Sequence, residues 1–518
     1  MAAVADEISQ VRIYPDRQCI VMPVRTDVMR LLPQAKPFTV HGRGMMALPH
    51  QPEVVRLLYN LGVTVPEPIR YYYDWRGTKP FQSQIDTAAL MTTHRRAYVL
   101  NQMGTGKTRA GLFAFDFLRK SKRASRMLVV APLSTLGAVW EVETFRYFHD
   151  MTAIVLHGAK AKRLKLLAQP ADIYIINHDG VNVIQKELLA ASFDCMIVDE
   201  LAAYRNARAL RWKALQPLVK KIPYVWGMTG APTPNEPVDA YGQIKLLTPE
   251  NVSFSYKAFK DSTMQQVTQF KWVPRANAND IVYAAMQPSI RVLRSDCLDL
   301  PPVTYSTREV ELDPAAGKNY KEMITHLATQ VRNKEITAAN EGVKLSKLLQ
   351  ISAGFAYDGQ NAGNYIGGKA RISEVFDIVE EAEGKVIVFA PFTYLVDVLA
   401  EALGKRWPTA KVYGDTPRSK RDEIYASFQV SSEPRVLVAH PQCMAHGLTL
   451  TAADTIVWAA PTQSLEIYEQ ANARITRPGQ RNHSHVIHIM STKAEQQVYN
   501  RLERRAKMQG ALLEMFES

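Results

Sequence analysis

The sequence predicts an α/β protein with two parallel-sheet lobes, a small N-terminal α+β unit and a helical insert between the lobes. Short apolar runs alternate with helix-like segments over residues 71–250, and the same alternation returns from Lys385 onward. Such alternation is typical of parallel strands whose connecting helices cover the sheet. The chain has 518 residues, too many for one hydrophobic core, so several structural units are expected.

The expected boundaries follow these changes of pattern. The predicted units are an N-terminal accessory unit at 1–70, a first lobe at 71–250, a helical insert or linker at 251–365, a second lobe at 366–492 and a C-terminal helix at 493–518. In the accessory unit, 11–14 and 19–24 indicate strands, whereas 28–32 and 52–61 indicate helices. A DNA-binding role for this unit is left open.

Each lobe contains a series of short apolar runs, as expected of buried parallel strands. The strands predicted for the first lobe are 97–100, 127–131, 153–157, 173–176, 195–198 and 224–228. Those predicted for the second lobe are 385–389, 411–413, 435–438, 455–458 and 485–489. Residues 251–365 lose this alternation, and 320–331 and 343–349 indicate helices there. The segment 493–516 predicts a charged amphipathic helix packed on the second lobe.

Composition narrows the class of protein. The chain is 47% hydrophobic and 22% charged, as globular proteins are, and no apolar run approaches the roughly 20 residues that span a bilayer. The N-terminus lacks the apolar core of a secretion signal, and the four cysteines form no C-x-x-C pair, which favours the reducing cytoplasm without a zinc site. A net charge of +13 favours a polyanionic partner.

A phosphate-binding loop is the most informative motif. The run 101–108 (N-Q-M-G-T-G-K-T) follows a predicted strand and precedes a helix-like segment. Its two glycines let backbone N–H groups converge on phosphates, and the helix N-terminus adds its dipole. Lys107 can reach the β- and γ-phosphates of ATP, and the Thr108 hydroxyl can ligate Mg²⁺. The usual first glycine of this motif is Asn101 here, and a plain glycine-rich turn is the alternative interpretation.

A pair of carboxylates follows the apolar run 193–198. Asp199 and Glu200 then lie at the edge where α/β sheets bind ligands. Asp199 would hold Mg²⁺, directly or through water, and Glu200 would polarise the attacking water. An isolated Asp-Glu pair is usually a solvated strand end, so this interpretation depends on the lysine loop upstream.

Two arginines complete the predicted site. In the run 470–480, Arg474 and Arg477 are spaced so that one helix face could present both. Arginines supplied across a cleft neutralise charge that develops on the γ-phosphate. An ordinary basic helix is the alternative, but the two lobes and the phosphate loop favour the catalytic interpretation.

With these motifs in order, the chain resembles the Swi/Snf group of superfamily-two helicases and translocases, in a minimal bacterial or phage form. The resemblance covers about residues 71–500. It implies two RecA-like, doubly wound lobes and a DNA-stimulated ATPase that uses ATP and Mg²⁺. It further implies a cytoplasmic, nucleoid-associated monomer that moves along double-stranded DNA and acts on forks or bound proteins.

The resemblance also assigns roles to individual positions. Catalytic roles fall on Lys107, Asp199, Glu200, Arg474 and Arg477. Nucleotide-binding roles fall on Gln82, in the place of an adenine-reading glutamine, and on Met103, Gly104, Thr105, Gly106, Lys107 and Thr108. Mg²⁺ would be held by Thr108 and Asp199. Coupling to DNA falls on Ser134 of motif Ia, on Thr229, Gly230 and Asn235 of motif III, on Gly447 and Thr449 of motif V, and on Gln470 of motif VI.

The chain departs from the family pattern at two motifs. The fourth position of motif II, often His or Gln, is Ala202, so a contact between the lobes is expected to be missing there. In motif V, Met444, Ala445 and Thr449 replace the usual glycines and asparagine, which puts a DNA contact in doubt. The segment between the lobes is short, so large protrusions like those of chromatin remodellers are not expected.

Three functions remain open on the sequence alone. They are a translocase on duplex DNA, a conventional strand-separating helicase on DNA or RNA, and an ATP-gated scaffold for a partner such as RNA polymerase. The complete set of catalytic residues argues against the scaffold. Two further motifs have simple structural explanations. The histidines of one, His483, His485 and His488, would lie on both faces of a strand rather than around a metal ion. The other, Tyr71–Tyr73, could stack on a base or pack within the fold.

Overall fold

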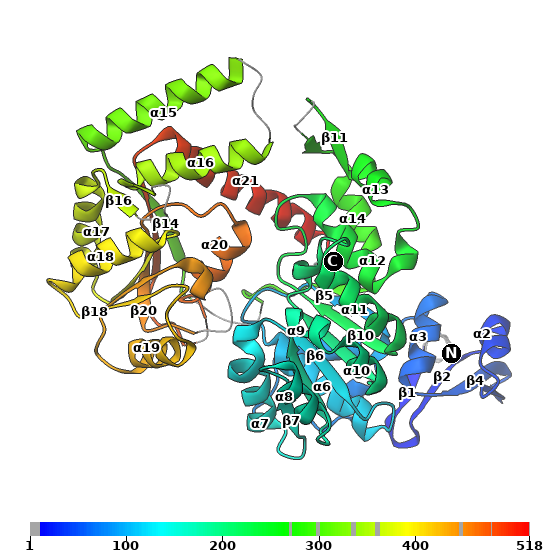
Figure 1. Cartoon of the computed structure of the whole chain (residues 1–518). Helices are drawn as coiled ribbons and strands as arrows, with labels where there is room; N and C mark the ends of the chain where they lie inside the picture. The colour runs from blue at the N-terminus through cyan, green and yellow to red at the C-terminus, as the bar shows by residue number, and fades with distance from the viewer. Residues whose placement is uncertain are drawn as a thin grey trace.

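The computed structural model describes residues 11–268, 272–296, 301–332, 338–357, 363–444, 449–477 and 479–516. Ala445 and Gly447, both assigned to motif V, lie outside the described residues. Three bodies follow one another across the molecule: the small N-terminal unit, the first lobe and the second lobe (Figure 1).

The first lobe is built on a seven-stranded parallel sheet in the order β13-β5-β10-β9-β6-β8-β7. Its strands are β5 (Arg96–Val99), β6 (Met127–Ala131), β7 (Ala153–Val155), β8 (Ile173–Asn177), β9 (Cys195–Asp199), β10 (Tyr224–Met228) and β13 (Ser289–Ile290). Its helices are α4 (Ile69–Tyr72), α5 (Gln82–Thr93), α6 (Lys107–Lys120), α7 (Val142–Tyr147), α8 (Lys160–Leu167), α9 (His178–Val183), α10 (Gln185–Ala190), α11 (Leu210–Lys221) and α12 (Ala240–Leu247). Every strand predicted for this lobe is present. Central strands such as β6 and β10 are buried along their whole length and are therefore apolar, whereas β7 at the edge is half-buried.

The second lobe contains a six-stranded parallel sheet in the order β14-β21-β20-β17-β19-β18. Its strands are β14 (Val303–Glu309), β17 (Lys385–Phe389), β18 (Thr409–Val412), β19 (Val436–Ala439), β20 (Ala453–Trp458) and β21 (Ser484–Met490). Its helices are α17 (Lys369–Glu381), α18 (Thr393–Gly404), α19 (Arg418–Val430) and α20 (Leu465–Asn472). The two parallel sheets flanked by helices confirm the predicted α/β fold with two RecA-like lobes.

The segment 251–365, predicted as a helical insert or linker, also contains strands. It contains β11 (Met264–Gln266), β12 (Trp272–Pro274), β13, β14, β15 (Phe355–Tyr357) and β16 (Gly363–Tyr365), with α13 (Tyr256–Thr263), α14 (Ala278–Ala285), α15 (Pro314–Arg332) and α16 (Ala338–Ser352). β13 extends the first sheet and β14 forms an edge of the second. β13 has two residues and β14 is mostly exposed, so neither produces an apolar run. The true insert is the α15–α16 pair, which projects from the second lobe (Figure 1).

The N-terminal unit is a four-stranded antiparallel sheet in the order β1-β2-β4-β3 with two helices. Its elements are β1 (Arg12–Tyr14), β2 (Cys19–Pro23), α2 (Thr26–Leu31), β3 (Lys36–Val40), β4 (Arg43–Pro49) and α3 (Pro52–Asn60). β3 and β4 were absent from the sequence prediction, because β3 is exposed and β4 is rich in Met, Ala and Leu, which are strong helix formers. Glu53 of α3 pairs with Arg123 at 2.9 Å, which fastens the unit to the first lobe.

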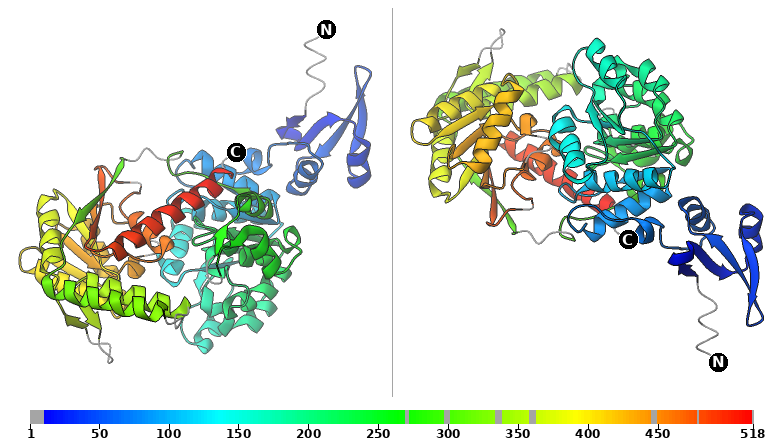
Figure 2. Two further views of the ribbon diagram at one scale, coloured as in Figure 1. Left: turned by 90° about the horizontal axis from the view of Figure 1, so that it is seen from above. Right: turned by 90° about the horizontal axis from the view of Figure 1, so that it is seen from below.

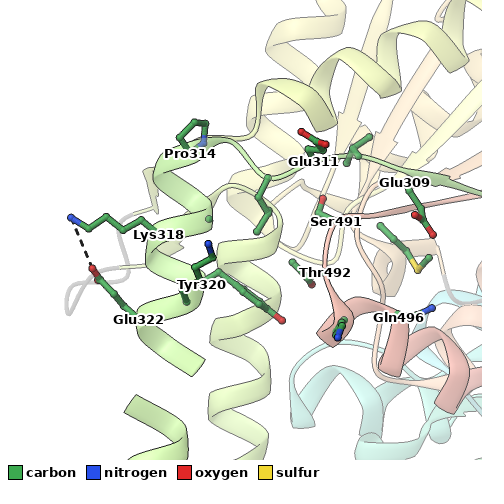
Figure 3. A pocket seen from close by; sticks show the side chains of 15 residues that line it. Glu309, Glu311, Pro314, Lys318, Tyr320, Glu322, Ser491, Thr492 and Gln496 are labelled. Atoms are coloured by element: carbon green, nitrogen blue, oxygen red, sulfur yellow. Dashed lines mark ion pairs between the residues drawn. The ribbon is translucent and has the colours of Figure 1, made fainter. Parts of the chain in front are cut away.

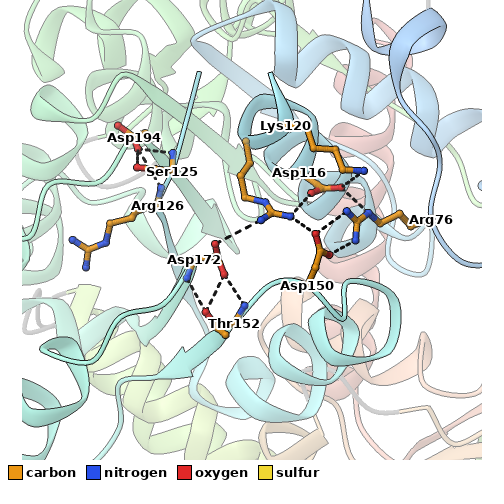
Figure 4. A network of polar contacts seen from close by, with 10 residues as sticks. Arg76, Asp116, Lys120, Ser125, Arg126, Asp150, Thr152, Asp172 and Asp194 are labelled. Atoms are coloured by element: carbon orange, nitrogen blue, oxygen red, sulfur yellow. Dashed lines mark hydrogen bonds and ion pairs between the residues drawn. The ribbon is translucent and has the colours of Figure 1, made fainter. Parts of the chain in front are cut away.

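A network of polar contacts joins the segment before α5 to α6 (Figure 4). Asp116 of α6 is fully buried, and it accepts a hydrogen bond from Tyr73 at 2.7 Å and ion pairs with Arg76 at 2.8 Å. Arg119 pairs with both Asp116 and Asp150, and the two arginines lower the pKa of Asp150. The segment before α5 is therefore held against the C-terminal part of α6.

The C-terminal helix α21 (Lys493–Glu514) packs on both lobes. At its start, Glu495 is fully buried and pairs with Arg371 of α17 at 2.9 Å. At its end, Leu513 and Phe516 enter the core of the first lobe, where Phe516 lies 4.9 Å from Tyr283 between ring centres. The prediction that this helix packs on the second lobe covers only its first half, and Figure 2 shows it running between the two lobes.

Candidate functional site

The loop between β5 and α6 is wound around Lys107. Gly104 and Gly106 have φ angles of 88° and 79°, which disfavour any residue with a side chain. Lys107 Nζ donates to the carbonyl oxygen of Asn101 at 2.7 Å and to that of Gln102 at 3.3 Å. The lysine is therefore folded onto carbonyls of its own loop, in the place where a phosphate oxygen would compete for it.

Asn101, which replaces the usual first glycine, is buried and ties the loop to α5. Its Nδ2 donates to Thr87 Oγ1 at 2.8 Å, whereas its Oδ1 has no hydrogen-bond partner. Thr105, also buried, donates through Oγ1 to the Gln102 carbonyl at 2.9 Å. The side chain of Asn101 thus holds the loop against α5. An asparagine in place of the usual first glycine is therefore compatible with a phosphate-binding loop.

The glutamine that touches the loop is Gln84 and not the predicted Gln82. Gln82 is exposed, and its Nε2 donates to Asp86 at 3.0 Å. Gln84 accepts from the Phe81 backbone N–H at 3.0 Å and donates to the Gly106 carbonyl at 3.4 Å. A Cβ on Gly106 would lie 2.1 Å from Gln84 Nε2. Gln84 lies three residues after Phe81, which caps the start of α5, and a glutamine at this spacing is the signal in the sequence that identifies it.

The two carboxylates lie at the end of β9, as predicted. Asp199 Oδ2 accepts from the indole N–H of Trp140 at 3.0 Å, and its Oδ1 accepts from the backbone N–H of Glu200 at 3.1 Å. Trp140 lies in the π-helical turn η3 (Leu136–Glu141), which follows motif Ia. Glu200 has a φ of 53°, a left-handed conformation that costs a residue with a side chain about 1–2 kcal/mol. Such strain is characteristic of functional sites.

Burial shifts the ionisation of all three central groups. Together with the negative charge of the neighbouring Asp199, it raises the pKa of Glu200 to about 8. It also raises the pKa of Asp199 and lowers the pKa of Lys107. A carboxyl group whose pKa lies near neutrality is suited to take a proton from water.

Arg474 and Arg477 follow α20 on the second lobe's side of the cleft. Arg474 is 1% exposed, and its Nε donates to the Gln470 carbonyl at 2.8 Å. Arg477 donates through Nε to the Ala473 carbonyl at 3.0 Å and through Nη1 to Thr449 Oγ1 at 3.4 Å. The Nε of each arginine is thus bonded to a carbonyl of its own segment.

The charge on these arginines reaches the carboxylate side of the cleft. Burial, together with the smaller effect of the neighbouring Arg294, lowers the pKa of Arg477 to about 10. The positive charge of Arg474 acts in turn to lower the pKa of Glu200, against the larger effect of burial. The structure therefore brings groups from both lobes into electrostatic contact.

Two direct contacts join the lobes beside this site. Arg294 donates from its backbone N–H to Gln102 Oε1 at 2.9 Å and from Nη1 to Thr476 Oγ1 at 2.8 Å. Arg205 Nη1 lies 3.7 Å from Glu466 Oε2 of α20. Arg205 directly follows the 3₁₀ turn η4 (Leu201–Tyr204), in which Ala202 is buried. Ala202 itself is buried in this turn, and a contact to the second lobe is made three residues later, by Arg205.

Motif III lies against the phosphate loop. The Thr229 backbone N–H donates to the Val99 carbonyl at 3.0 Å, and a Cβ on Gly230 would lie 3.5 Å from the Asn101 carbonyl. The backbone N–H of Asn235, the last residue of the motif, donates to Asp239 Oδ2 at 2.9 Å.

The other residues predicted to couple to DNA are more scattered. Ser134 and Thr449 are exposed, whereas Gln470 is buried in α20 and donates to Glu466 at 3.5 Å. Gly447 falls outside the described residues.

A cavity of about 950 Å³ lies between the lobes, beside the phosphate loop. Gln102, Met103 and Gly230 line it from the first lobe, Thr476 from the second, and Arg294 from the connection between them. α21 closes one side. A separate open groove of about 1090 Å³ runs between α15 and the start of α21 (Figure 3), and none of the predicted site residues lines it.

The three C-terminal histidines serve local packing. His483 stacks on His485 with ring centres 4.8 Å apart and bonds Thr304 Oγ1 at 2.7 Å. His488 bonds the Tyr468 hydroxyl at 2.8 Å. Within the described part of the chain, no helix combines the length and apolarity that crossing a bilayer requires.

Comparison with known proteins places these features in a family. The SNF2-related domain matches residues 50–356 and the helicase conserved C-terminal domain matches residues 370–479. Protein p41 of Acyrthosiphon pisum secondary endosymbiont phage 1 is 27% identical over 417 residues, which are 76% of this chain and 88% of the phage protein.

Longer relatives match over a similar region. The SWI/SNF-related matrix-associated actin-dependent regulator of chromatin subfamily A-like protein 1 of Xenopus tropicalis is 26% identical over 76% of this chain and 41% of its own length. The DNA annealing helicase and endonuclease ZRANB3 of Homo sapiens is 23% identical over 84% of this chain and 40% of its own length. The chain thus spans about two fifths of each of these two vertebrate proteins.

Among solved structures, the Sulfolobus solfataricus SWI2/SNF2 ATPase core in complex with dsDNA covers 86% of this chain and 95% of its own, with 20% identity and a TM-score of 0.42. The SNF2-related match alone extends over more than half of the 518 residues, and the helicase C-terminal match continues it through the second lobe. The protein therefore belongs to the SNF2-related family of helicase-like, ATP-hydrolysing enzymes.

Proposed function

We propose that this chain is an ATP-driven translocase on duplex DNA that remodels forks or displaces bound proteins. One observation carries the proposal: Lys107 and Glu200 of the first lobe lie close enough to Arg477 and Arg474 of the second, respectively, for their charges to act on one another. A site that needs both lobes is complete only when they are together. Hydrolysis and release then change the position of one lobe against the other.

The residues of the first lobe fit ATP with Mg²⁺. Lys107 would exchange the two loop carbonyls for phosphate oxygens, and the glycine turn leaves room for phosphates beside the backbone. Thr108 and Asp199 would hold the metal ion, which neutralises charge on the phosphates when bound. Glu200 would take the proton of the attacking water, and Arg474 and Arg477 would neutralise the γ-phosphate charge from the second lobe.

DNA is the polyanion that best fits the rest of the chain. The net charge is +13, and Ser134 and Thr449 are exposed, one on each lobe. One relative carries the name DNA annealing helicase, which supports a DNA track for this chain as well. We further propose that the protein works as a monomer in the cytoplasm of a bacterial or phage-infected cell, close to the nucleoid.

The deciding experiment compares two assays at equal ATP turnover. We expect the protein to displace a triplex-forming third strand from an intact duplex while it unwinds a plain tailed duplex poorly. Opening a duplex costs about 1.4 kcal/mol per base-pair step, and a motor without a separating wedge loses the opened pairs to reannealing. Glu200→Gln, which should bind ATP without turnover, is the control in both assays.

The other outcomes select other functions. Efficient unwinding of long tailed duplexes without triplex displacement would replace the translocase by a conventional helicase. ATP binding without turnover on duplex DNA, single-stranded DNA or RNA would indicate an ATP-gated scaffold.

A further inference from the structure

The sheet of the N-terminal unit has one face that its helices do not cover. The other face carries Ile20, Met22, Met46 and Leu48, which are buried with residues of α2 and α3. The unit lies on the side of the first lobe away from the second lobe in all three views (Figures 1 and 2). The open face is therefore separate from the ATP site between the lobes.

Strand register places two aromatic and three basic side chains together on the open face. In β1 and β2, Arg12 is opposite Val21 and Tyr14 is opposite Cys19; in β3 and β4, Lys36 is opposite Ala47, Phe38 is opposite Met45 and Val40 is opposite Arg43. Directly opposed residues share a face, and alternate residues of one strand do so too. Five of the side chains on this face are named here the open-face set: Arg12, Tyr14, Lys36, Phe38 and Arg43.

The open-face set consists of aromatic and basic side chains only. Tyr14 is 43% exposed and Phe38 is 39% exposed, although large aromatic side chains are usually buried. β1, β2, β3 and β4 contain no aspartate or glutamate. The face therefore combines flat apolar rings with basic side chains.

We propose that this face binds single-stranded DNA, with bases stacked on Tyr14 and Phe38 and phosphates beside Arg12, Lys36 and Arg43. Unpaired bases can stack on aromatic side chains, whereas the bases of a duplex already stack on each other. Basic side chains around the rings attract the backbone.

The layout of the face suits a strand that crosses it diagonally. Tyr14 and Phe38 lie on opposite edge strands, about 14 Å apart across the sheet and about 13 Å apart along it. The row between them has Arg12 at one edge and Lys36 at the other, through Val21 and Ala47. This binding site goes beyond the ATP-driven motor, because it would hold an unpaired strand outside the cleft.

The test measures binding of the full chain to a short fluorescein-labelled oligothymidylate by anisotropy. Tyr14→Ala and Phe38→Ala should each weaken binding by about fivefold or more, and Phe38→Trp should retain it. Lys36→Ala and Arg43→Ala should each reduce the slope of log affinity against log salt by about 0.7. The control is Leu31→Ala, because Leu31 is 53% exposed on α2, on the other side of the sheet. Basal ATP turnover should stay unchanged in all of these variants.

Photocrosslinking separates this face from the motor, which could bind the same oligonucleotide. A 5-bromouracil oligonucleotide should crosslink to peptides that contain Tyr14 or Phe38, and an unlabelled duplex should compete poorly. The proposal is overturned if the aromatic variants bind as tightly as wild type, if crosslinks fall only in the two lobes, or if the duplex competes as well as the single strand.

Discussion

Glu200 has a pKa of about 8 in the resting cleft, because burial and Asp199 both disfavour its charged form. A general base acts only when it is ionised, and kcat/KM reports the ionisation of the free enzyme. We expect kcat/KM for ATP to rise as the pH approaches about 8 and then to level off. Glu200→Gln should lower kcat by roughly 10²–10⁴ while a fluorescent ATP analogue still binds. Turnover within twofold of wild type would remove Glu200 from this role.

The pair Arg205–Glu466 should matter for turnover more than for stability. Their side chains are 41% and 26% exposed, and exposed pairs contribute only about 0–1 kcal/mol. Arg205→Glu or Glu466→Arg alone would set like charges against each other between the lobes and should reduce DNA-stimulated kcat several-fold. The double reversal should recover most of the rate, with thermal unfolding nearly constant throughout.

A matched control for this pair exists within the first lobe. Arg211 lies 3.2 Å from Asp179, with side chains that are 39% and 73% exposed. Arg211→Glu should leave ATP turnover unchanged. If the double reversal at 205 and 466 is as slow as either single change, the pair does not couple the lobes.

At this scale, sequence reasoning finds residues that belong to local motifs and misses residues that depend on tertiary contact. Lys107, Asp199 and Glu200 lie in short runs whose chemistry is readable, and the structure brings them together. Arg205 and Glu466 are far apart in the chain, so only the packing of the lobes pairs them. The catalytic roles assigned to five residues stay predictions until the variants are measured: Lys107, Asp199, Glu200, Arg474 and Arg477.

Among the elements, α21 depends on one buried ion pair at its start. Arg371 Nη2 donates to Glu495 Oε1 at 2.9 Å and to Oε2 at 3.0 Å, and both side chains are almost fully buried. Glu495→Ala would leave the guanidinium buried without its carboxylate, so we expect the free energy of unfolding to fall by about 3–5 kcal/mol in urea titrations. Glu503→Ala, on the exposed side of the same helix, should have little effect. Equal losses in the two variants would contradict the role of the buried pair.

The elements that sequence reasoning missed share a physical cause. Buried parallel strands such as β6 and β19 are apolar throughout, and their hydrophobic runs identify them. β14 and β3 are exposed along most of their length, so their sequences show no hydrophobic run that would identify them as strands. Edge strands of this kind are fixed by the neighbours that they pair with, which the sequence does not display.

For the whole molecule, the positive charge should appear in the salt dependence of DNA binding. A net charge of +13 allows several phosphates to be neutralised at once. If about five phosphates are contacted, log affinity for duplex DNA against log salt should have a slope near −4 to −5. ATP binding without DNA, measured over the same salt range, is the comparison and should change far less. A slope near zero for duplex DNA would mean that the charge serves another purpose.

The path of the chain between the lobes also limits how they can move. The chain passes from the first sheet to the second between β13 and β14, and α21 then returns it to the core of the first lobe. α21 is about 33 Å long, with its start on the second lobe and its end in the core of the first. The lobes are therefore joined by two links, and any change in their relative position must be compatible with both. If ATP turnover moves the lobes, as proposed above, the two links would confine them to the same path in every cycle.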